Sequence, residues 1–188
     1  MKFPKTYTME SERCRYRLPN EADFPFIESA CKYQGFNDGM LWEPPKCEAD
    51  FTEPLKRSIE SWEQDKAYVF TIEDKVSGQF LGRIGIRHVE NTIWDFGYFT
   101  HPESQGKGYM TEAVGRMLKW TFEELEGTRV EACYATWNVA SKIVMERNGF
   151  KFIEHLEKGF QKHGKWVAED KMAITKEQWL SENPDNGN

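Results

Sequence analysis

The sequence predicts a single α/β domain, of the α+β kind, built on a largely antiparallel sheet. In some segments apolar residues recur at spacings of three and four, which is typical of helices. In other segments apolar and polar residues alternate, which is typical of strands. Three of the expected strands follow one another through short links, which makes them antiparallel neighbours. The 188 residues suit one domain with a sizeable core, and they contain no internal repeat. We therefore expect one domain over 1–188, with a core of about 12–180 and a frayed tail over 181–188.

The first part of the chain is expected to form a strand and two helices. Basic and apolar residues alternate over 12–18, and Asn20 then caps a helix that runs to about Tyr33 and breaks at Gly35. The segment GFNDGMLWEPP that follows is an irregular aromatic loop. A helical stripe predicts the second helix, over 48–64, and its members are Phe51, Leu55, Ile59 and Trp62.

The rest of the chain alternates strands and helices. The three antiparallel strands are expected over 67–74, 79–90 and 91–100, with a turn at Ser77-Gly78 between the first two. The remaining expected elements are a helix over 108–126, a strand over 129–136, a helix over 138–149, and strands over 150–158 and 165–175.

Composition and charge exclude several classes of protein. The net charge of −6 argues against nucleic acid as a partner, because a protein that binds phosphate backbones usually carries a basic face, and it favours cationic partners such as amines. The N-terminus lacks the apolar core of a signal peptide, and no apolar run approaches the roughly 20 residues that span a bilayer. The four cysteines show no C-x-x-C spacing, so we expect free thiols, no structural metal and a cytoplasmic location.

The most informative segment is SQGKGYMTEAV, residues 104–114, where two glycines stand directly before a helical run. A P-loop is excluded, because Gly106-Lys107 is followed by glycine and His101 stands where the first glycine should be. A dinucleotide-binding fingerprint is disfavoured, because Thr111 replaces its third glycine and antiparallel strands precede the turn. Two interpretations stay open on the glycines alone: a tight turn, or an anion cradle at the positive end of a helix.

The residues around the turn decide between these interpretations. The segments WDFGYFTHPESQGKGYMTEA and WNVASKIVMERNGF together resemble the GNAT superfamily of acyl-CoA-dependent N-acyltransferases, and within it the RimJ/RimL-like branch. The pyrophosphate motif of that family, [QR]-x-x-G-x-[GA], falls on Gln105, Gly106, Lys107, Gly108, Tyr109 and Met110, with Met110 in place of a small residue. The resemblance covers nearly the whole chain. It implies a mixed, mostly antiparallel sheet of six to seven strands with helices on both faces.

The resemblance also implies how acetyl-CoA is held. Two neighbouring parallel strands, 93–100 and 130–136, splay apart, and the pantetheine arm lies between them. Main-chain groups of Phe99 and Thr100 are then expected to hydrogen-bond the arm and polarise the thioester. Asn138 is a candidate for a further hydrogen bond, although its role as a helix cap explains it equally well. Lys142 is a candidate for the 3′-phosphate, with simple solvation as the alternative.

Two residues are candidates for proton transfer. Many members of the superfamily carry a tyrosine where this chain has Met145, and the branch carries a serine at the place of Ser141. We expect Ser141 to protonate the departing thiolate, with a water as the acid, or a binding role for the serine, as the alternative. Asp95 is expected to accept the proton of the amine or to bind the ammonium, with a surface carboxylate beside Arg83 or Arg87 as the alternative. Glu154 is a second acidic candidate.

The expected reaction is direct attack of a primary amine on acetyl-CoA in a ternary complex. The branch points to the α-amine of a protein N-terminus, with a small antibiotic or polyamine as the alternative acceptor and a non-catalytic acyl-CoA-binding module as the rival from another class. A homodimer is suggested by the family alone. The residues expected to wall the acceptor pocket are Phe36, Met40, Trp42 and Trp137.

Overall fold

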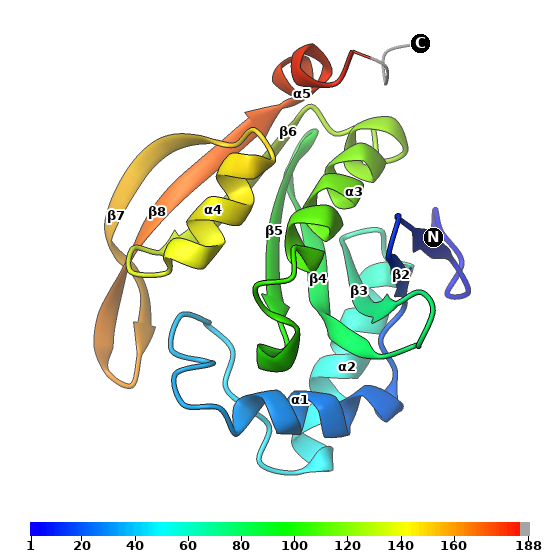
Figure 1. The fold of residues 1–188 in the computed structure, drawn as a ribbon, viewed down its shortest axis with the longest axis vertical. Coiled ribbons are helices and arrows are strands. Elements are labelled where there is room, and N and C mark those ends of the chain that lie inside the picture. The colour runs from blue at the N-terminus through cyan, green and yellow to red at the C-terminus, as the bar shows by residue number, and fades with distance from the viewer. Residues whose placement is uncertain (185–188) are drawn as a thin grey trace.

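The chain folds around one eight-stranded mixed sheet, shown in Figure 1 for the computed structural model, which describes residues 1–184. The strand order is β1-β2-β3-β4-β5-β6-β8-β7. The strands are β1 (Thr8–Glu10), β2 (Cys14–Arg17), β3 (Ala67–Asp74), β4 (Phe80–Glu90), β5 (Ile93–Thr100), β6 (Arg129–Ala135), β7 (Lys151–Lys162) and β8 (Lys165–Thr175). The helices are η1 (Glu21–Asp23), α1 (Phe24–Cys31), α2 (Glu48–Glu63), η2 (Pro102–Ser104), α3 (Tyr109–Glu123), α4 (Val139–Arg147) and α5 (Lys176–Glu182).

The centre of the sheet contains one parallel pair, β5 and β6, and every other neighbouring pair is antiparallel. These two strands pair along three consecutive positions, from Ile93 opposite Arg129 to Asp95 opposite Glu131. Beyond Asp95 each strand continues without the other, to Thr100 and to Ala135. The structure therefore confirms the splayed parallel pair that the sequence predicts.

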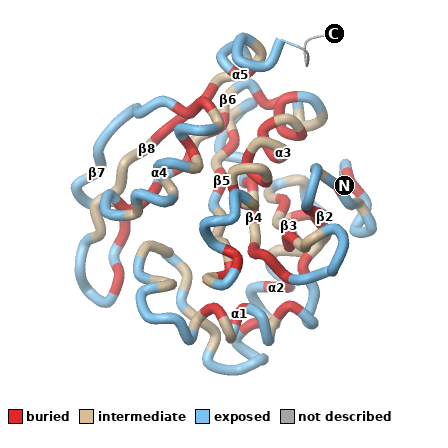
Figure 2. The backbone as a smooth tube through the Cα atoms, in the orientation of Figure 1, coloured by how far each residue is buried: buried red, intermediate tan, exposed pale blue. Residues whose placement is uncertain are grey.

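Helices pack on both faces of the sheet, as expected. Trp94 and Phe96 of β5 belong to a large core that includes the buried face of α3, whereas Phe99 packs against a smaller cluster from α1 and α2. Because alternate residues of a strand point to opposite faces, the two clusters lie on opposite sides of the sheet. Figure 2 shows buried residues concentrated on the central strands and α3, and exposed residues along the edge strand β7.

Four expectations about the elements need correction. The sheet has one strand more than the six to seven expected, because β1 precedes β2. The first helix is a 3₁₀ turn followed by the shorter α1. Strand β7 extends to Lys162, beyond its expected end at 158, and the hairpin turns at His163 and Gly164.

The fourth correction concerns the expected frayed tail. Residues 181 and 182 belong to α5, which Thr175 and Gln178 fix through a reciprocal capping box. The last four residues of that tail, 185–188, lie outside the described residues. Within residues 1–184 no helix has the length and apolar character needed to cross a membrane.

Candidate active site

A cleft of about 1800 Å³ begins at the turn after β5, follows the gap between β5 and β6, and opens on the face that carries α1 and α2. The residues that line it include Gly106 and Met110 at one end, Tyr98 and Ser141 in the middle, and Trp42 at the other end. The glycine turn, the splayed strands and the aromatic loop, which the sequence singles out separately, thus belong to one space.

The glycine turn has left-handed backbone at both glycines, with φ of +73° at Gly106 and +80° at Gly108. A Cβ atom added at Gly106 would meet no heavy atom within 4 Å, so the backbone conformation, not crowding, is the reason for glycine there. Gly108 directly precedes the fifteen-residue α3, whose first N–H groups have no partner within the helix. The turn is therefore both a tight turn and an opening beside a helix N-terminus.

Arg13 supports this turn from outside, a role that the sequence does not reveal. Its guanidinium donates to the main-chain oxygen of Lys107 (3.0 Å), pairs with Glu112 (Nε–Oε2 2.7 Å) and stacks 4.6 Å from the ring centre of Tyr109. Burial alone would raise the pKa of Glu112, but hydrogen bonds from Ser11 and Arg13 outweigh it and lower that pKa. Because Arg13 lies 94 residues from Lys107 in the chain, no local motif signals the contact.

The remaining motif residues hold the turn or enter the core. Lys107 Nζ donates to the main-chain oxygen of Glu103 (2.8 Å), and Gln105 Nε2 donates to that of Thr100 (3.3 Å). Met110, the departure from the motif, is 6% exposed and belongs to the large core. Its side chain therefore does not crowd the turn.

The register of β4 and β5 determines which main-chain groups of β5 face the cleft. The main-chain N–H of His101 donates to the main-chain oxygen of Leu81 (2.8 Å), so these two opposite residues form a hydrogen-bonded pair. Arg83 and Phe99 are opposite each other two positions further along the ladder, so they form the next pair of the same kind. Since main-chain groups alternate sides along an antiparallel pair, those of Phe99 point toward β4, and those of Tyr98 and Thr100 point toward the cleft. Tyr98 and Thr100, rather than Phe99, thus present their main-chain groups to the cleft, and the Phe99 ring lies beside those of Phe36 and Trp42.

Ser141 lies at the middle of the cleft and shares a hydrogen bond with Tyr98. Tyr98 Oη is 2.8 Å from Ser141 Oγ and also donates to the main-chain oxygen of Ser141 (3.2 Å). Asn138 Oδ1 accepts from the N–H of Ser141 (3.1 Å), which caps α4. Burial raises the pKa of Tyr98 to about 12, so this hydroxyl is protonated at neutral pH. Met145 is buried in the large core and does not reach the cleft.

The two acidic candidates lie on the cleft with different partners. Asp95 forms an ion pair with Arg87 (2.5 Å), which is the alternative that the sequence leaves open. Arg83 instead pairs with the buried Asp23 (3.2 Å). Glu154 lines the cleft from β7 and is exposed.

Helix α4 carries two basic residues that could meet a phosphate group, Lys142 and Arg147. Lys142 pairs with Glu146 on the same helix (3.7 Å) and does not line the cleft, whereas Arg147 does. Arg147 has no ion pair within residues 1–184, so it is the better placed cation for a phosphate group.

An aromatic wall closes the other end. The rings of Phe36 and Trp42 lie 5.5 and 5.8 Å from that of Phe99, measured between ring centres. Met40 and Trp137 line the same end, and Trp137 is 56% exposed. The four predicted wall residues therefore meet at one end of the cleft, with Phe99 as a fifth member.

The wall is fastened by Lys162, a buried cation that the sequence does not single out. Its Nζ donates to Asn37 Oδ1 (2.5 Å) and to the main-chain oxygen of Trp42 (3.0 Å), and it pairs with Glu43 (2.9 Å). This one side chain ties the end of β7 to the loop between α1 and α2.

The four cysteines are free thiols, as expected. Within the described part of the chain no three His, Cys, Asp or Glu side chains are arranged to hold a metal ion. The predicted independence from metal remains a prediction.

The comparison with protein families decides the class of this cleft. The family described as an acetyltransferase (GNAT) domain matches residues 13–151. The chain belongs to the GNAT acetyltransferase family. The matched range includes the glycine turn, both splayed strands and Ser141.

Individual relatives agree with this membership. The Bacillus subtilis protein YdaF, whose name assigns it provisionally to ribosomal N-acetyltransferases, is 34% identical over 113 residues. That match covers 58% of this chain and 59% of YdaF, so the chain spans about three fifths of this relative.

Solved structures share the fold at low sequence identity. RimL, a ribosomal L7/L12 α-N-protein acetyltransferase solved with coenzyme A, gives a TM-score of 0.80 at 16% identity, covering 90% of this chain and 98% of RimL. The Vibrio cholerae spermidine N-acetyltransferase, solved with coenzyme A and spermine, gives 0.78 at 20% identity, covering 90% and 99%. Both belong to the same fold as this GNAT domain.

Proposed function

We propose that the protein transfers an acetyl group from acetyl-CoA to a primary amine by direct attack within a ternary complex. The observation that carries this proposal is the gap that opens between β5 and β6 after Asp95 and leads directly to the glycine turn before α3. An extended arm fits such a gap, and the turn offers N–H groups at a helix N-terminus to an anion.

The residues present fit coenzyme A along the whole cleft. The turn from Gln105 to Met110 would hold the pyrophosphate, and main-chain groups of Tyr98 and Thr100 would bond the pantetheine arm. Arg147 would meet the 3′-phosphate in preference to Lys142. The coenzyme supplies an acetyl thioester whose carbonyl carbon accepts the amine nitrogen.

The Ser141 and Tyr98 hydroxyls provide the proton for the leaving thiolate. Their 2.8 Å hydrogen bond joins two groups that stay protonated at neutral pH, and one of them lines the middle of the cleft on α4. A positioned general acid of this kind contributes about 10²- to 10⁴-fold to the rate. This pair replaces the tyrosine that Met145 cannot supply.

The acceptor that we propose is the α-amine of a protein N-terminus. At neutral pH roughly one α-amine in seven is already unprotonated, against about one lysine side chain in a few thousand. The names of YdaF and RimL support this class, and the spermidine acetyltransferase keeps a polyamine as the alternative acceptor.

Two variants test coenzyme binding at the turn. Gly106 and Gly78 have φ of +73° and +72°, and an added Cβ meets nothing within 4 Å at either position, so substitution imposes the same backbone strain at both. Calorimetric titration with acetyl-CoA and desulfo-CoA should show micromolar binding that Gly106→Trp abolishes and Gly78→Trp preserves. Equal binding by both variants would remove the coenzyme from the turn.

The acceptor is then identified by coenzyme release over a panel of amines. The panel contains peptides with a free α-amine, the same peptides acetylated at the N-terminus but carrying lysine, and spermidine. Turnover of the free α-amine peptides alone is the expected result. Binding of acetyl-CoA without turnover of any amine would favour a non-catalytic acyl-CoA-binding module.

A further inference from the structure

Glu169 on β8 is a cleft residue to which neither the motifs nor the comparisons assign a role. It pairs with Ala135 on β6 and with Leu156 on β7, and it lines the cleft at the end of the splayed part of β6. Its side chain is half-buried, and within residues 1–184 no hydrogen bond or ion pair joins its carboxylate to another residue. A half-buried carboxylate without a partner is costly and therefore points to a ligand.

The edge strand is shaped to leave room for this carboxylate. The pairing of β7 with β8 is shifted between Leu156 and Phe160, where β7 bulges away from β8. Gly159 lies in this bulge, and a Cβ atom added there would collide with the Glu169 carboxylate. The bulge and the missing side chain at Gly159 together leave room for the Glu169 carboxylate, which bonds to no other described residue.

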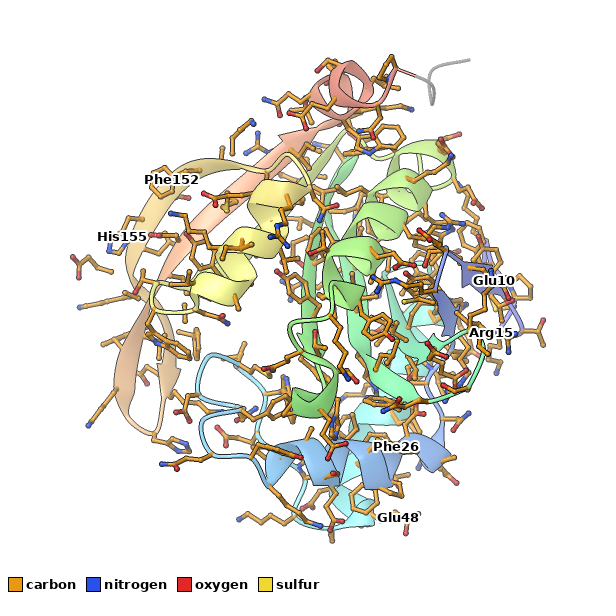
Figure 3. All side chains as sticks on the ribbon, viewed as in Figure 1. Glu10, Arg15, Phe26, Glu48, Phe152 and His155 are labelled. Atoms are coloured by element: carbon orange, nitrogen blue, oxygen red, sulfur yellow. The ribbon has the colours of Figure 1, made fainter. Side chains whose placement is uncertain are left out.

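Neighbouring carboxylates on the same strands are already occupied. Glu131 on β6 is held between Arg129 (2.7 Å) and Lys171 (2.5 Å). Asp170, next to Glu169 but on the other face, accepts from Tyr134 and lies 2.8 Å from His155 Nδ1. Figure 3 shows His155 on the outer strand β7. Asp95 is paired with Arg87, as described above, which leaves Glu169 as the free half-buried carboxylate among the described residues that line the cleft.

We propose that Glu169 is a catalytic residue, the base that takes the proton from the ammonium of the acceptor. This inference rests on the proposed acetyl transfer. It assigns the role expected for Asp95 to a different carboxylate, one that has no cation bound to it.

The charges around Glu169 are consistent with this role. Burial raises the pKa of Glu169, which brings the carboxylate closer to the range in which a base works at neutral pH. The groups on the same face are Lys171 along β8, Cys133 on β6 and Glu154 on β7. Burial, followed by the charge of Glu169, raises the pKa of Cys133 to about 11, so this thiol is protonated at neutral pH and does not compete as a base.

The proposed step conserves protons and electrons. The Glu169 carboxylate takes one proton from the ammonium, and the freed lone pair of the nitrogen forms the C–N bond with the thioester carbon. The C–S bond then breaks with its electron pair on sulfur. The thiolate takes a proton from the Ser141–Tyr98 pair, the nitrogen releases its second proton to that pair through solvent, and Glu169 returns its own proton to water.

The test is the pH dependence of kcat for Glu169→Gln, with a free α-amine peptide as acceptor. At pH 7 the variant should be about sevenfold slower, because roughly one α-amine in seven is already unprotonated at that pH. Its rate should recover as the pH rises through the pKa of the amine itself, about 8, because the unprotonated amine needs no base. Glu157→Gln is the matched control, since Glu157 lies in the same bulge with a side chain 90% exposed, and it should keep the wild-type profile.

The outcomes separate this inference from the proposed function. A wild-type rate in Glu169→Gln, or a loss by the same factor at every pH, would overturn the role of Glu169 while leaving acetyl transfer intact. Absence of turnover by the wild type over the whole amine panel would overturn the proposed function and this inference with it. Calorimetric binding of acetyl-CoA should be unchanged in Glu169→Gln, which shows that the variant is folded.

Discussion

Tyr98 contributes to the site through two different parts of one residue. Its main-chain groups face the cleft because of the β4–β5 register, and its hydroxyl lies 2.8 Å from Ser141 Oγ. Residue patterns alone point to Ser141 and leave Tyr98 out, because the hydrogen bond joins segments 43 residues apart. A single strand residue thus presents its main chain to the cleft and its hydroxyl to Ser141.

At this scale we expect Ser141→Ala to lower kcat by about 10²-fold, because the thiolate loses its acid. Tyr98→Phe should have a smaller effect, since Ser141 keeps its own proton. Stopped-flow or steady-state coenzyme release measures both. Calorimetric affinity for acetyl-CoA should stay within about twofold in each variant, and a Ser141→Ala enzyme of wild-type kcat would exclude the serine as the acid.

At the scale of elements, the β7–β8 hairpin and the loop after α1 act as one unit. Lys162 is buried between them, and among residues 1–184 its side chain bonds only to loop atoms, from Asn37, Trp42 and Glu43. The loop has no regular structure of its own, so its aromatic residues depend on this attachment for their position. The position of the aromatic wall therefore depends on a contact between two elements more than a hundred residues apart in the chain.

Lys162→Met should loosen this wall without touching the coenzyme end. Buried acceptors left without a donor cost about 1–3 kcal/mol, so we expect KM for the amine to rise by roughly tenfold or more. Lys165→Met is the control, because Lys165 is the exposed partner of Lys162 across the hairpin. A change in acetyl-CoA affinity equal to that in KM for the amine would show a general loss of structure instead.

The sequence predicts features that are marked by residues close together in the chain, and it does not predict contacts between residues that are far apart. The strands β3 to β6 and helices α2 to α4 show local periodicity, and all are present close to their expected positions. The short β1 and the capped α5 were not expected, because three residues carry too little alternation and the last turn lies in a polar tail. The turn at 105–110 is a contiguous motif, whereas Arg13, Lys162 and Glu169 reach the site only through the fold.

At the scale of the whole molecule, Asp23 links four parts of the N-terminal half. It is fully buried and bonds to Arg17 of β2 (2.6 Å), Thr71 of β3 (2.6 Å) and Arg83 of β4 (3.2 Å). Burial alone would raise the pKa of Asp23, but the hydrogen bonds from Arg17 and Thr71 and the two guanidinium charges outweigh it and lower the pKa below 3.8. The ionised form therefore stabilises the folded state.

We expect Asp23→Asn to lower the free energy of unfolding at pH 7 by about 3–5 kcal/mol, because Arg83 is left as a buried charge. The pKa of Asp23 is lower in the folded protein than in the unfolded chain, where it is about 3.9. The stabilisation by the ionised carboxylate is therefore fully present at pH values above about 3.9, and it is lost as the pH falls through the pKa of the folded state. Urea unfolding at pH 7 and pH 3 measures both effects. Glu21→Gln, an exposed change in the same 3₁₀ turn, should leave both values unchanged.

The separation of β5 from β6 has a consequence for the protein before it meets its coenzyme. Beyond the three paired positions, each strand carries main-chain groups that no neighbouring strand satisfies, so the sheet has two open edges inside the molecule as well as those at β1 and β7. Open strand edges attract other extended chains and promote aggregation. The coenzyme arm, lying where a ninth strand would fit, would shield both inner edges at once, and the empty protein is the form most exposed to unwanted pairing.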